Sequence, residues 1–133
     1  MDTNVLLQLY GTTQSYYQIT DALQQGRLEI AVSNEILLEY EETLPRLSGQ
    51  RRWEMVWRFL DGVSRLHNNV LYAEPHFRFA VISEDPDDNK FVDCAIVVQA
   101  DYILTSDHHF DVLQTSGYRP KPIHPQKFIA SHL

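Results

Sequence analysis

The polar and apolar positions of this chain switch between helical and strand-like spacing. From Thr13 to Gln25 the apolar side chains recur every three or four residues, as on one face of a helix, and Gly26 suits the helix end. A second helix is predicted to begin after Ser33, a good N-cap residue, and to end at Pro45. Between these helices, residues 28–32 alternate like a short strand.

Two longer helices are predicted in the middle and late parts of the chain, at Arg51–Leu66 and at Asp88–Gln99. The first has its apolar side chains on one stripe, made of Trp53, Val56, Trp57, Leu60 and Val63. The shorter predicted elements are strands at 70–72, 102–105 and 121–123 and helices at 110–115 and 125–132. Residues 74–87 contain two prolines and are predicted to be irregular, with extended pieces near 79–82.

Strands that alternate with helices predict a mostly parallel central sheet covered on both faces, a three-layer α/β/α fold. The 133 residues suffice for one domain with a single core, so one domain over 1–133 is predicted. Residues 1–7 resemble the end of a strand that runs into a turn or helix.

The net charge and the cysteine content of the chain limit which functions are compatible with the sequence. The formal net charge of -7 argues against a protein that holds nucleic acid by a general basic field. It is compatible with a metal-dependent nuclease, because bound cations offset clustered carboxylates. The single cysteine, Cys94, cannot form an intramolecular disulfide, and the chain has no run of 18 apolar residues and no basic leader, which predicts a cytoplasmic protein.

Four carboxylates fall where parallel α/β domains place functional groups. Asp2 and Asp107 follow predicted strands, Asp88 opens a helix, and Glu39 lies on the helix after the second strand. Taken singly, each has an ordinary explanation: Asp2 and Glu39 as exposed acids, Asp88 as a helix-start carboxylate beside the macrodipole, and Asp107 as an N-cap. Four acids that converge would repel one another, so their joint placement favours bound Mg²⁺ or Mn²⁺.

The same residues resemble a known family, the PIN-domain ribonucleases, which include the VapC-type toxins of prokaryotic toxin–antitoxin pairs. The family pattern matches Asp2-Thr3-Asn4, Glu39 within Glu35-Ile36-Leu37-Leu38-Glu39-Tyr40, and Asp107 within Thr105-Ser106-Asp107. It also matches Asp88 within Asp85-Pro86-Asp87-Asp88-Asn89-Lys90-Phe91, a form that points to a subgroup described as toxins. The motifs occur in the family's order over nearly the whole chain.

This resemblance implies a PIN-like α/β/α fold and a metal-dependent endoribonuclease. It implies that Asp2, Glu39, Asp88 and Asp107 are catalytic and bind Mg²⁺ or Mn²⁺ directly or through water. Asn4 and Thr105 would support these ligands or contact the substrate, and Asp93 would be an outer acid at most. The implied partners are an RNA substrate, a cognate antitoxin and a second copy in a homodimer, with no membrane.

The start of the chain departs from the family pattern. Family members have four or five apolar residues before the first Asp, where this chain has only Met1. The first strand is therefore expected to be cut short, with Asp2 poorly anchored, and an N-terminally extended form is expected to be more stable and to bind metal more tightly.

Several residues outside the acidic set carry weaker signals. Arg51, Arg58 and Arg65 repeat every seven residues and form a solvated basic face or contact RNA or an acidic partner. Trp53 and Trp57 are expected in the core, or packed against a dimer partner. His108-His109 has poor geometry for joint metal binding and is expected to be a surface or capping pair.

Two other functions remain open. In a haloacid-dehalogenase-like phosphatase, Asp2 would be a nucleophile and Asp107 with Asp111 would hold Mg²⁺, although that family has a second Asp where this chain has Asn4. Alternatively, the PIN fold would serve without strong catalysis as a binding module for RNA or protein. The complete set of four acids argues against this module.

Overall fold

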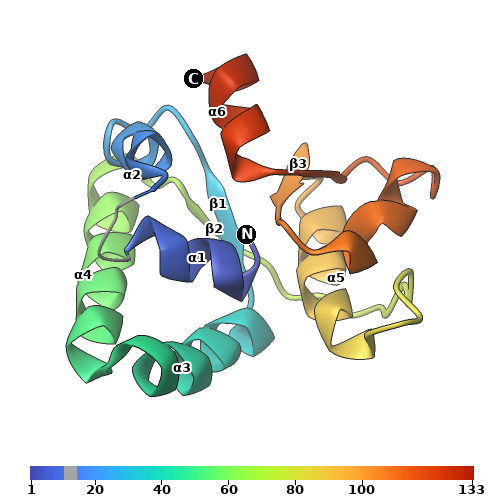
Figure 1. Ribbon diagram of the computed structural model, residues 1–133, viewed down its shortest axis with the longest axis horizontal. Coiled ribbons are helices and arrows are strands. Elements are labelled where there is room, and N and C mark those ends of the chain that lie inside the picture. Colours follow the sequence, from blue (N-terminus) through green and yellow to red (C-terminus); the bar gives the residue numbers. More distant parts are fainter. Residues whose placement is uncertain (11–14) are drawn as a thin grey trace.

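The computed structural model describes residues 1–10 and 15–133. Helices surround two short pairs of parallel strands (Figure 1). The N-terminal part contains α1 (Thr3–Leu9), α2 (Tyr17–Gln24), β1 (Ile30–Val32), α3 (Asn34–Ser48), α4 (Gln50–His67) and β2 (Val70–Tyr72). The C-terminal part contains η1 (Pro86–Asp88), α5 (Asn89–Val97), β3 (Tyr102–Leu104), η2 (His108–Gln114), β4 (Lys121–Ile123) and α6 (Pro125–His132).

The predicted parallel pairing of strands is confirmed. β1 pairs with β2, with Ile30 opposite Val70, and β3 pairs with β4, with Tyr102 opposite Lys121. Parallel strands need crossover connections, and here α3 with α4 links the first pair while η2 links the second. The four strands form two separate two-stranded sheets within the described residues, so β1 and β3 each have one hydrogen-bonded neighbour.

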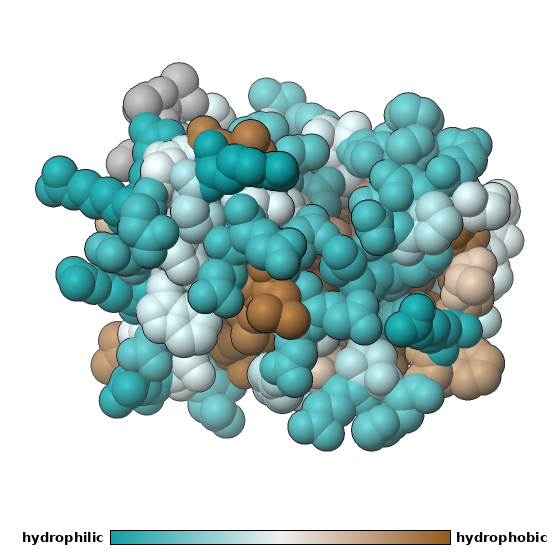
Figure 2. Space-filling model, turned by 90° about the horizontal axis from the view of Figure 1, so that it is seen from below, coloured by the Kyte–Doolittle hydropathy of each residue, from teal (hydrophilic) through white to brown (hydrophobic). Residues whose placement is uncertain are grey.

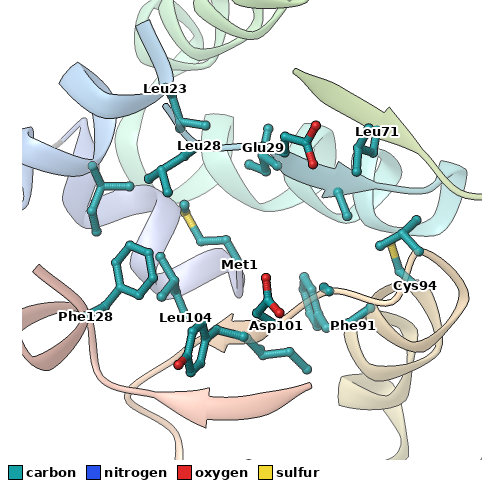
Figure 3. A pocket seen from close by; sticks show the side chains of 18 of the residues that line it. Met1, Leu23, Leu28, Glu29, Leu71, Phe91, Cys94, Asp101, Leu104 and Phe128 are labelled. Carbon is teal, nitrogen blue, oxygen red and sulfur yellow. The ribbon is translucent and has the colours of Figure 1, made fainter. Parts of the chain in front are cut away.

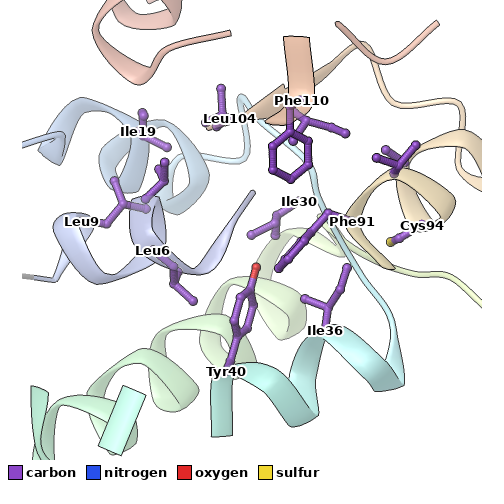
Figure 4. Packing of buried hydrophobic residues seen from close by; sticks show 14 of the residues in the cluster. Leu6, Leu9, Ile19, Ile30, Ile36, Tyr40, Phe91, Cys94, Leu104 and Phe110 are labelled. Atoms are coloured by element: carbon purple, nitrogen blue, oxygen red, sulfur yellow. The ribbon is translucent and has the colours of Figure 1, made fainter. Parts of the chain in front are cut away.

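The core lies between these sheets and the surrounding helices (Figure 4). Tyr40 of α3 is fully buried there, and its hydroxyl donates a hydrogen bond of 2.6 Å to the main-chain oxygen of Met1. Phe91 of α5 and Phe110 of η2 pack edge to face, with ring centroids 6.4 Å apart. The core therefore holds the start of the chain against the elements that carry the late acidic residues.

Most predicted elements occur, with shifted ends. The helix predicted from Thr13 spans Tyr17–Gln24 in the structure, and residues 13 and 14 lie outside the described part. No strand is present at 79–82, where side chains of α5 hold the loop instead. The short helix predicted at 110–115 is a 3-10 helix from His108 to Gln114.

The prediction that the helix after Ser33 ends at Pro45 is wrong, because α3 continues to Ser48. A proline removes one N–H donor and so one intrahelical bond, but its own carbonyl can still accept from the next turn, which lets the helix continue for a few residues. The helix ends instead at Gly49, whose φ of 89° suits glycine and whose N–H donates to the Pro45 oxygen at 2.9 Å.

The tryptophan stripe of α4 is less buried than predicted. Val56, Leu60 and Val63 face the core, whereas Trp57 is 51% exposed and Trp53 is partly buried. The two indole rings stack at a tilt, with centroids 5.9 Å apart. Figure 2 shows a face of the molecule that is largely hydrophilic, with apolar side chains gathered in small areas.

Candidate metal centre

Asp2 is held where the two halves of the chain meet. It caps α1, accepting the Val5 N–H at 2.8 Å, and its own N–H donates to the Leu104 oxygen at 3.1 Å. Its second carboxylate oxygen accepts a hydrogen bond from the hydroxyl of Thr105, directly after β3. Asp2 is 5% exposed, so this acid is fixed and buried rather than a loose terminal residue.

Thr105 joins Asp2 to the next acid. Its hydroxyl oxygen also accepts the Asp107 N–H at 3.0 Å, while the Asp107 carboxylate caps η2 by accepting the His109 N–H at 2.9 Å. Thr105 is buried, and the Asp107 side chain is 31% exposed. A single hydroxyl therefore sets the positions of two carboxylates that are 105 residues apart in sequence.

Asp88 lies among other negative charges. Burial, together with the carboxylates of Asp85, Asp107 and Asp2, raises the pKa of Asp88 to about 6, against a lowering by His109. One Asp88 oxygen, Oδ2, is buried without a hydrogen-bond partner among the described residues. A buried carboxylate oxygen without a donor is costly unless it holds a proton or a cation.

Glu39 reaches the same region from α3. The hydroxyl of Thr3 donates to one Glu39 oxygen, and Lys90 donates to the other in an ion pair that is mostly buried. Glu39 and Asp88 line one hollow of about 570 Å³ between α3 and the start of α5. The other acids lining this hollow are Glu35, Glu42, Asp85 and Asp87.

His109 also lies beside these acids, which the sequence did not predict. Its Nδ1 lies 3.3 Å from Asp107 Oδ1 and 3.6 Å from Asp88 Oδ2, and it is buried without a hydrogen-bond partner in the described part of the chain. His108, by contrast, has a 79% exposed side chain, as expected for a surface residue. However, His108 Nδ1 also lies 3.7 Å from Asp107 Oδ1, and ligand atoms of Glu84, His108 and His109 lie within 4.8 Å of one another, so the expectation that the two histidines have poor geometry for joint metal binding is wrong.

The donor set fits a divalent cation. One ligand atom each from Asp85, Asp88 and His109 lie within 4.8 Å of one another, and Asp107 adjoins the same imidazole. Within the described residues, no three of Asp2, Glu39, Asp88 and Asp107 form such a group. Asp88 belongs both to the predicted quartet and to this group of three.

The remaining predicted residues lie farther from this centre or have other contacts. Asn4 is exposed in the first turn of α1. Asp93 is 8% exposed and accepts the Phe79 N–H at 3.1 Å, which ties the irregular loop to α5, and burial raises its pKa. Arg51, Arg58 and Arg65 are exposed along α4, and Arg65 pairs with Asp61 at 2.9 Å.

The fold and site together define a class of small α/β domains with clustered acids at the ends of parallel strands. A family model described as PIN domain matches residues 1–109, and the chain belongs to the PIN-domain family. PIN domains are generally metal-dependent nucleases. Searches of curated proteins and of solved structures gave no match. No helix in the described ranges has the length and apolar character needed to cross a membrane.

Proposed function

We propose that this protein is a metal-dependent endoribonuclease that hydrolyses phosphodiester bonds in RNA. The observation that carries the proposal is Asp88, whose buried oxygen Oδ2 has no hydrogen-bond partner among the described residues while three other carboxylates raise its pKa. Such an arrangement favours a cation at this point. The family assignment makes nucleic acid the expected substrate.

Asp88 and Asp107 would hold Mg²⁺ or Mn²⁺, with Asp2 and Glu39 acting directly or through water. A bound divalent cation supplies charge stabilisation and lowers the pKa of a bound water. Thr105 keeps Asp2 and Asp107 in fixed orientations, and Lys90 holds Glu39 toward the hollow. These contacts preorganise oxygen donors on stiff elements, which metal sites require.

The negative charge of the hollow has a consequence for substrate binding. Six acidic side chains and Lys90 line it, so an RNA phosphate would be repelled from the metal-free protein. Cations bound at Asp88 and Asp107 would replace this repulsion of the RNA phosphate by attraction close to the metal. We therefore expect RNA to bind this edge weakly in EDTA and more tightly with Mn²⁺ present.

We also propose that this nuclease is the toxin of a toxin–antitoxin pair. Its protein partners would be a cognate antitoxin and a second copy of the chain in a homodimer. The motif from Asp85 to Phe91 supports the toxin assignment. Exposed apolar side chains on α4, with Leu66 76% and Trp57 51% exposed, support a protein-binding surface there.

Cleavage of a labelled single-stranded RNA in Mn²⁺ tests the reaction. Asp88→Asn and Asp107→Asn should each reduce the rate by roughly 100-fold or more, because each removes a ligand charge. Asp111→Asn is the matched control, since Asp111 is exposed on η2 and should leave the rate unchanged. Loss of RNA cleavage in Asp111→Asn as well would show that the effect is not specific to Asp88 and Asp107.

Undiminished cleavage in both Asp88→Asn and Asp107→Asn would remove the metal-site proposal. A wild-type protein that binds RNA or a protein partner but cleaves no RNA with Mn²⁺ or Mg²⁺ would favour the binding module.

A further inference from the structure

A second group of side chains with metal-ligating atoms lies close to the acidic hollow. One ligand atom each from Glu84, His108 and His109 lie within 4.8 Å of one another. None of the three lines the acidic hollow, and none lines the cavity of about 590 Å³ between β1 and β3, whose walls are mainly apolar (Figure 3). We call these three side chains the outer histidine group, because they lie outside both spaces.

His109 faces carboxylates with both of its ring nitrogens. Its Nδ1 lies 3.3 Å from Asp107 Oδ1 and 3.6 Å from Asp88 Oδ2, whereas its Nε2 lies 3.6 Å from Glu84 Oε2. A histidine that binds a metal usually turns its other ring nitrogen toward a carboxylate, which keeps the proton of the neutral ring on that nitrogen. With the proton on Nδ1, the lone pair of Nε2 is free on the side of Glu84.

The main chain and the burial of His109 hold its ring in this orientation. Its N–H donates to the Asp107 carboxylate at 2.9 Å. Its Nδ1 is buried, although the side chain as a whole is 27% exposed. The exposed part of the ring is therefore not at Nδ1, and a cation from solvent reaches the ring from another side.

His108 brings a second imidazole to the same place. The two rings have their centroids 4.6 Å apart and are tilted by 48°. His108 Nδ1 lies 3.7 Å from Asp107 Oδ1, so Asp107 adjoins one nitrogen of each ring. The His108 side chain is 79% exposed, so its rotation toward a cation displaces no packed neighbour.

Two imidazoles and one carboxylate are a donor set typical of zinc. Zn²⁺ binds nitrogen and carboxylate oxygen at about 2.0–2.2 Å, which places tetrahedral ligand atoms about 3.3 Å apart. Glu84 Oε2 and His109 Nε2, at 3.6 Å, are already close to this spacing. The Glu84 side chain is 71% exposed and free to adjust, as is His108. Mg²⁺ prefers oxygen ligands and suits the acidic hollow better.

We propose that Glu84, His108 and His109 bind a divalent transition-metal ion such as Zn²⁺, with water in the fourth position, at a site separate from the proposed nuclease centre. Glu84 belongs to the irregular segment that leads to Asp85 and Asp88, whereas the two histidines begin η2. An ion at this site would fasten that segment to η2. It would thereby stabilise the segments that carry the late acids.

Calorimetric titration with Zn²⁺ tests the site in protein that carries Asp88→Asn. This background removes an acid of the proposed nuclease centre, and no RNA is present, so the outcome does not depend on the nuclease proposal. Added to it, Glu84→Gln and His108→Gln should each weaken Zn²⁺ binding at least about tenfold, because each removes a ligand. Glu74→Gln and His76→Gln, at exposed positions outside the group, are matched controls and should leave the affinity unchanged.

Three further measurements locate the ion in the Asp88→Asn protein. Zn²⁺ at about a hundredfold excess over its Kd should raise Tm by roughly 8 °C. In NMR spectra it should shift the ring C–H signals of His108 and His109 and leave those of His76 in place. Mg²⁺ at about tenfold excess over Zn²⁺ should not displace it, because imidazole favours Zn²⁺.

Three results would overturn the proposal. Equal Zn²⁺ affinity with and without His108→Gln in the Asp88→Asn background would show that the outer histidine group does not bind the ion. Unshifted ring signals of His108 and His109 would show the same. Displacement of Zn²⁺ by Mg²⁺ would show that carboxylates alone hold the ion.

Discussion

The hydroxyl of Thr105 donates a hydrogen bond to the buried carboxylate of Asp2, so the end of β3 orients the acid that begins α1. This contact joins the first and last thirds of the chain at the candidate site. It also makes the site depend on how β3 is placed. Removal of one hydroxyl should therefore affect both folding and metal binding.

Thr105→Val keeps the shape of the side chain and removes its hydrogen bonds to Asp2 and Asp107. Loss of a buried bond to a charged group should cost about 1.5–3 kcal/mol in the free energy of unfolding. Mn²⁺ affinity should fall about tenfold, as is common for residues that orient metal ligands. Urea unfolding and titration calorimetry measure the two effects.

Thr20→Val is the control for Thr105→Val, because the Thr20 hydroxyl donates to the main-chain oxygen of Tyr17 in a solvent-exposed bond on α2. It should change stability little. If Thr105→Val and Thr20→Val have equal Mn²⁺ affinity, the hydroxyl of Thr105 does not orient the metal ligands.

The sequence predicted that Asp88 and Asp107 lie at helix starts, and both do: Asp107 caps η2 with its carboxylate, whereas Asp88 precedes α5 without a side-chain capping bond. Their role as metal ligands stays a prediction. It did not predict the positions of His108 and His109, since the 3-10 form of η2 places both imidazoles near carboxylates and a two-histidine motif carries no sign of this. The exposure of Trp57 could not be predicted either. The spacing of apolar residues shows which side chains share one face of α4, but not which of them point into the core. The parallel pairing of the strands was predictable because strands alternate with helices along the sequence. The separation of the strands into two sheets was not, because it depends on side-chain packing.

The raised pKa of Asp88 predicts how stability varies with pH in the metal-free protein. The folded pKa of about 6 exceeds the ordinary value of 3.8, so the protonated form is favoured by folding. This contribution is fully present below about pH 4 and is lost as pH rises through about 6. In EDTA, the Tm of wild type relative to Asp88→Asn should therefore fall over this range.

At pH 7.5 in EDTA, Asp88→Asn should be more stable than wild type by about 1 kcal/mol, after allowance for solvent screening of a partly exposed group. With Mn²⁺ the order should reverse, since only wild type gains a ligand-linked increase in Tm. Asp85→Asn and Asp87→Asn provide comparisons within the same segment. A wild type that is more stable than Asp88→Asn in EDTA at pH 7.5 would contradict the destabilisation of the Asp88 carboxylate by burial and by its acidic neighbours.

His109 should influence which cation binds. Imidazole is a better ligand for Mn²⁺ and Zn²⁺ than for Mg²⁺, which prefers oxygen donors. His109→Gln should therefore weaken Mn²⁺ binding about tenfold and change Mg²⁺ binding much less. Calorimetric titration with each metal measures this difference, and His76→Gln, at an exposed position outside both groups of metal-ligating side chains, should change neither affinity. Equal losses for both metals would mean that His109 positions Asp107 rather than binding the cation.

Asn89 should be essential for the loop that carries Asp85. Its side chain accepts the Ile82 N–H at 2.9 Å and donates to the Ile82 oxygen at 2.8 Å, so it satisfies both main-chain groups of one residue. Asn89→Asp retains the acceptor but places a carboxylate against a carbonyl oxygen, which should cost about 1–3 kcal/mol in unfolding free energy. Urea denaturation measures this cost. Asn68→Asp is the control, since Asn68 is exposed at the end of α4, and an equal loss in both variants would show that the paired bonds to Ile82 contribute nothing specific.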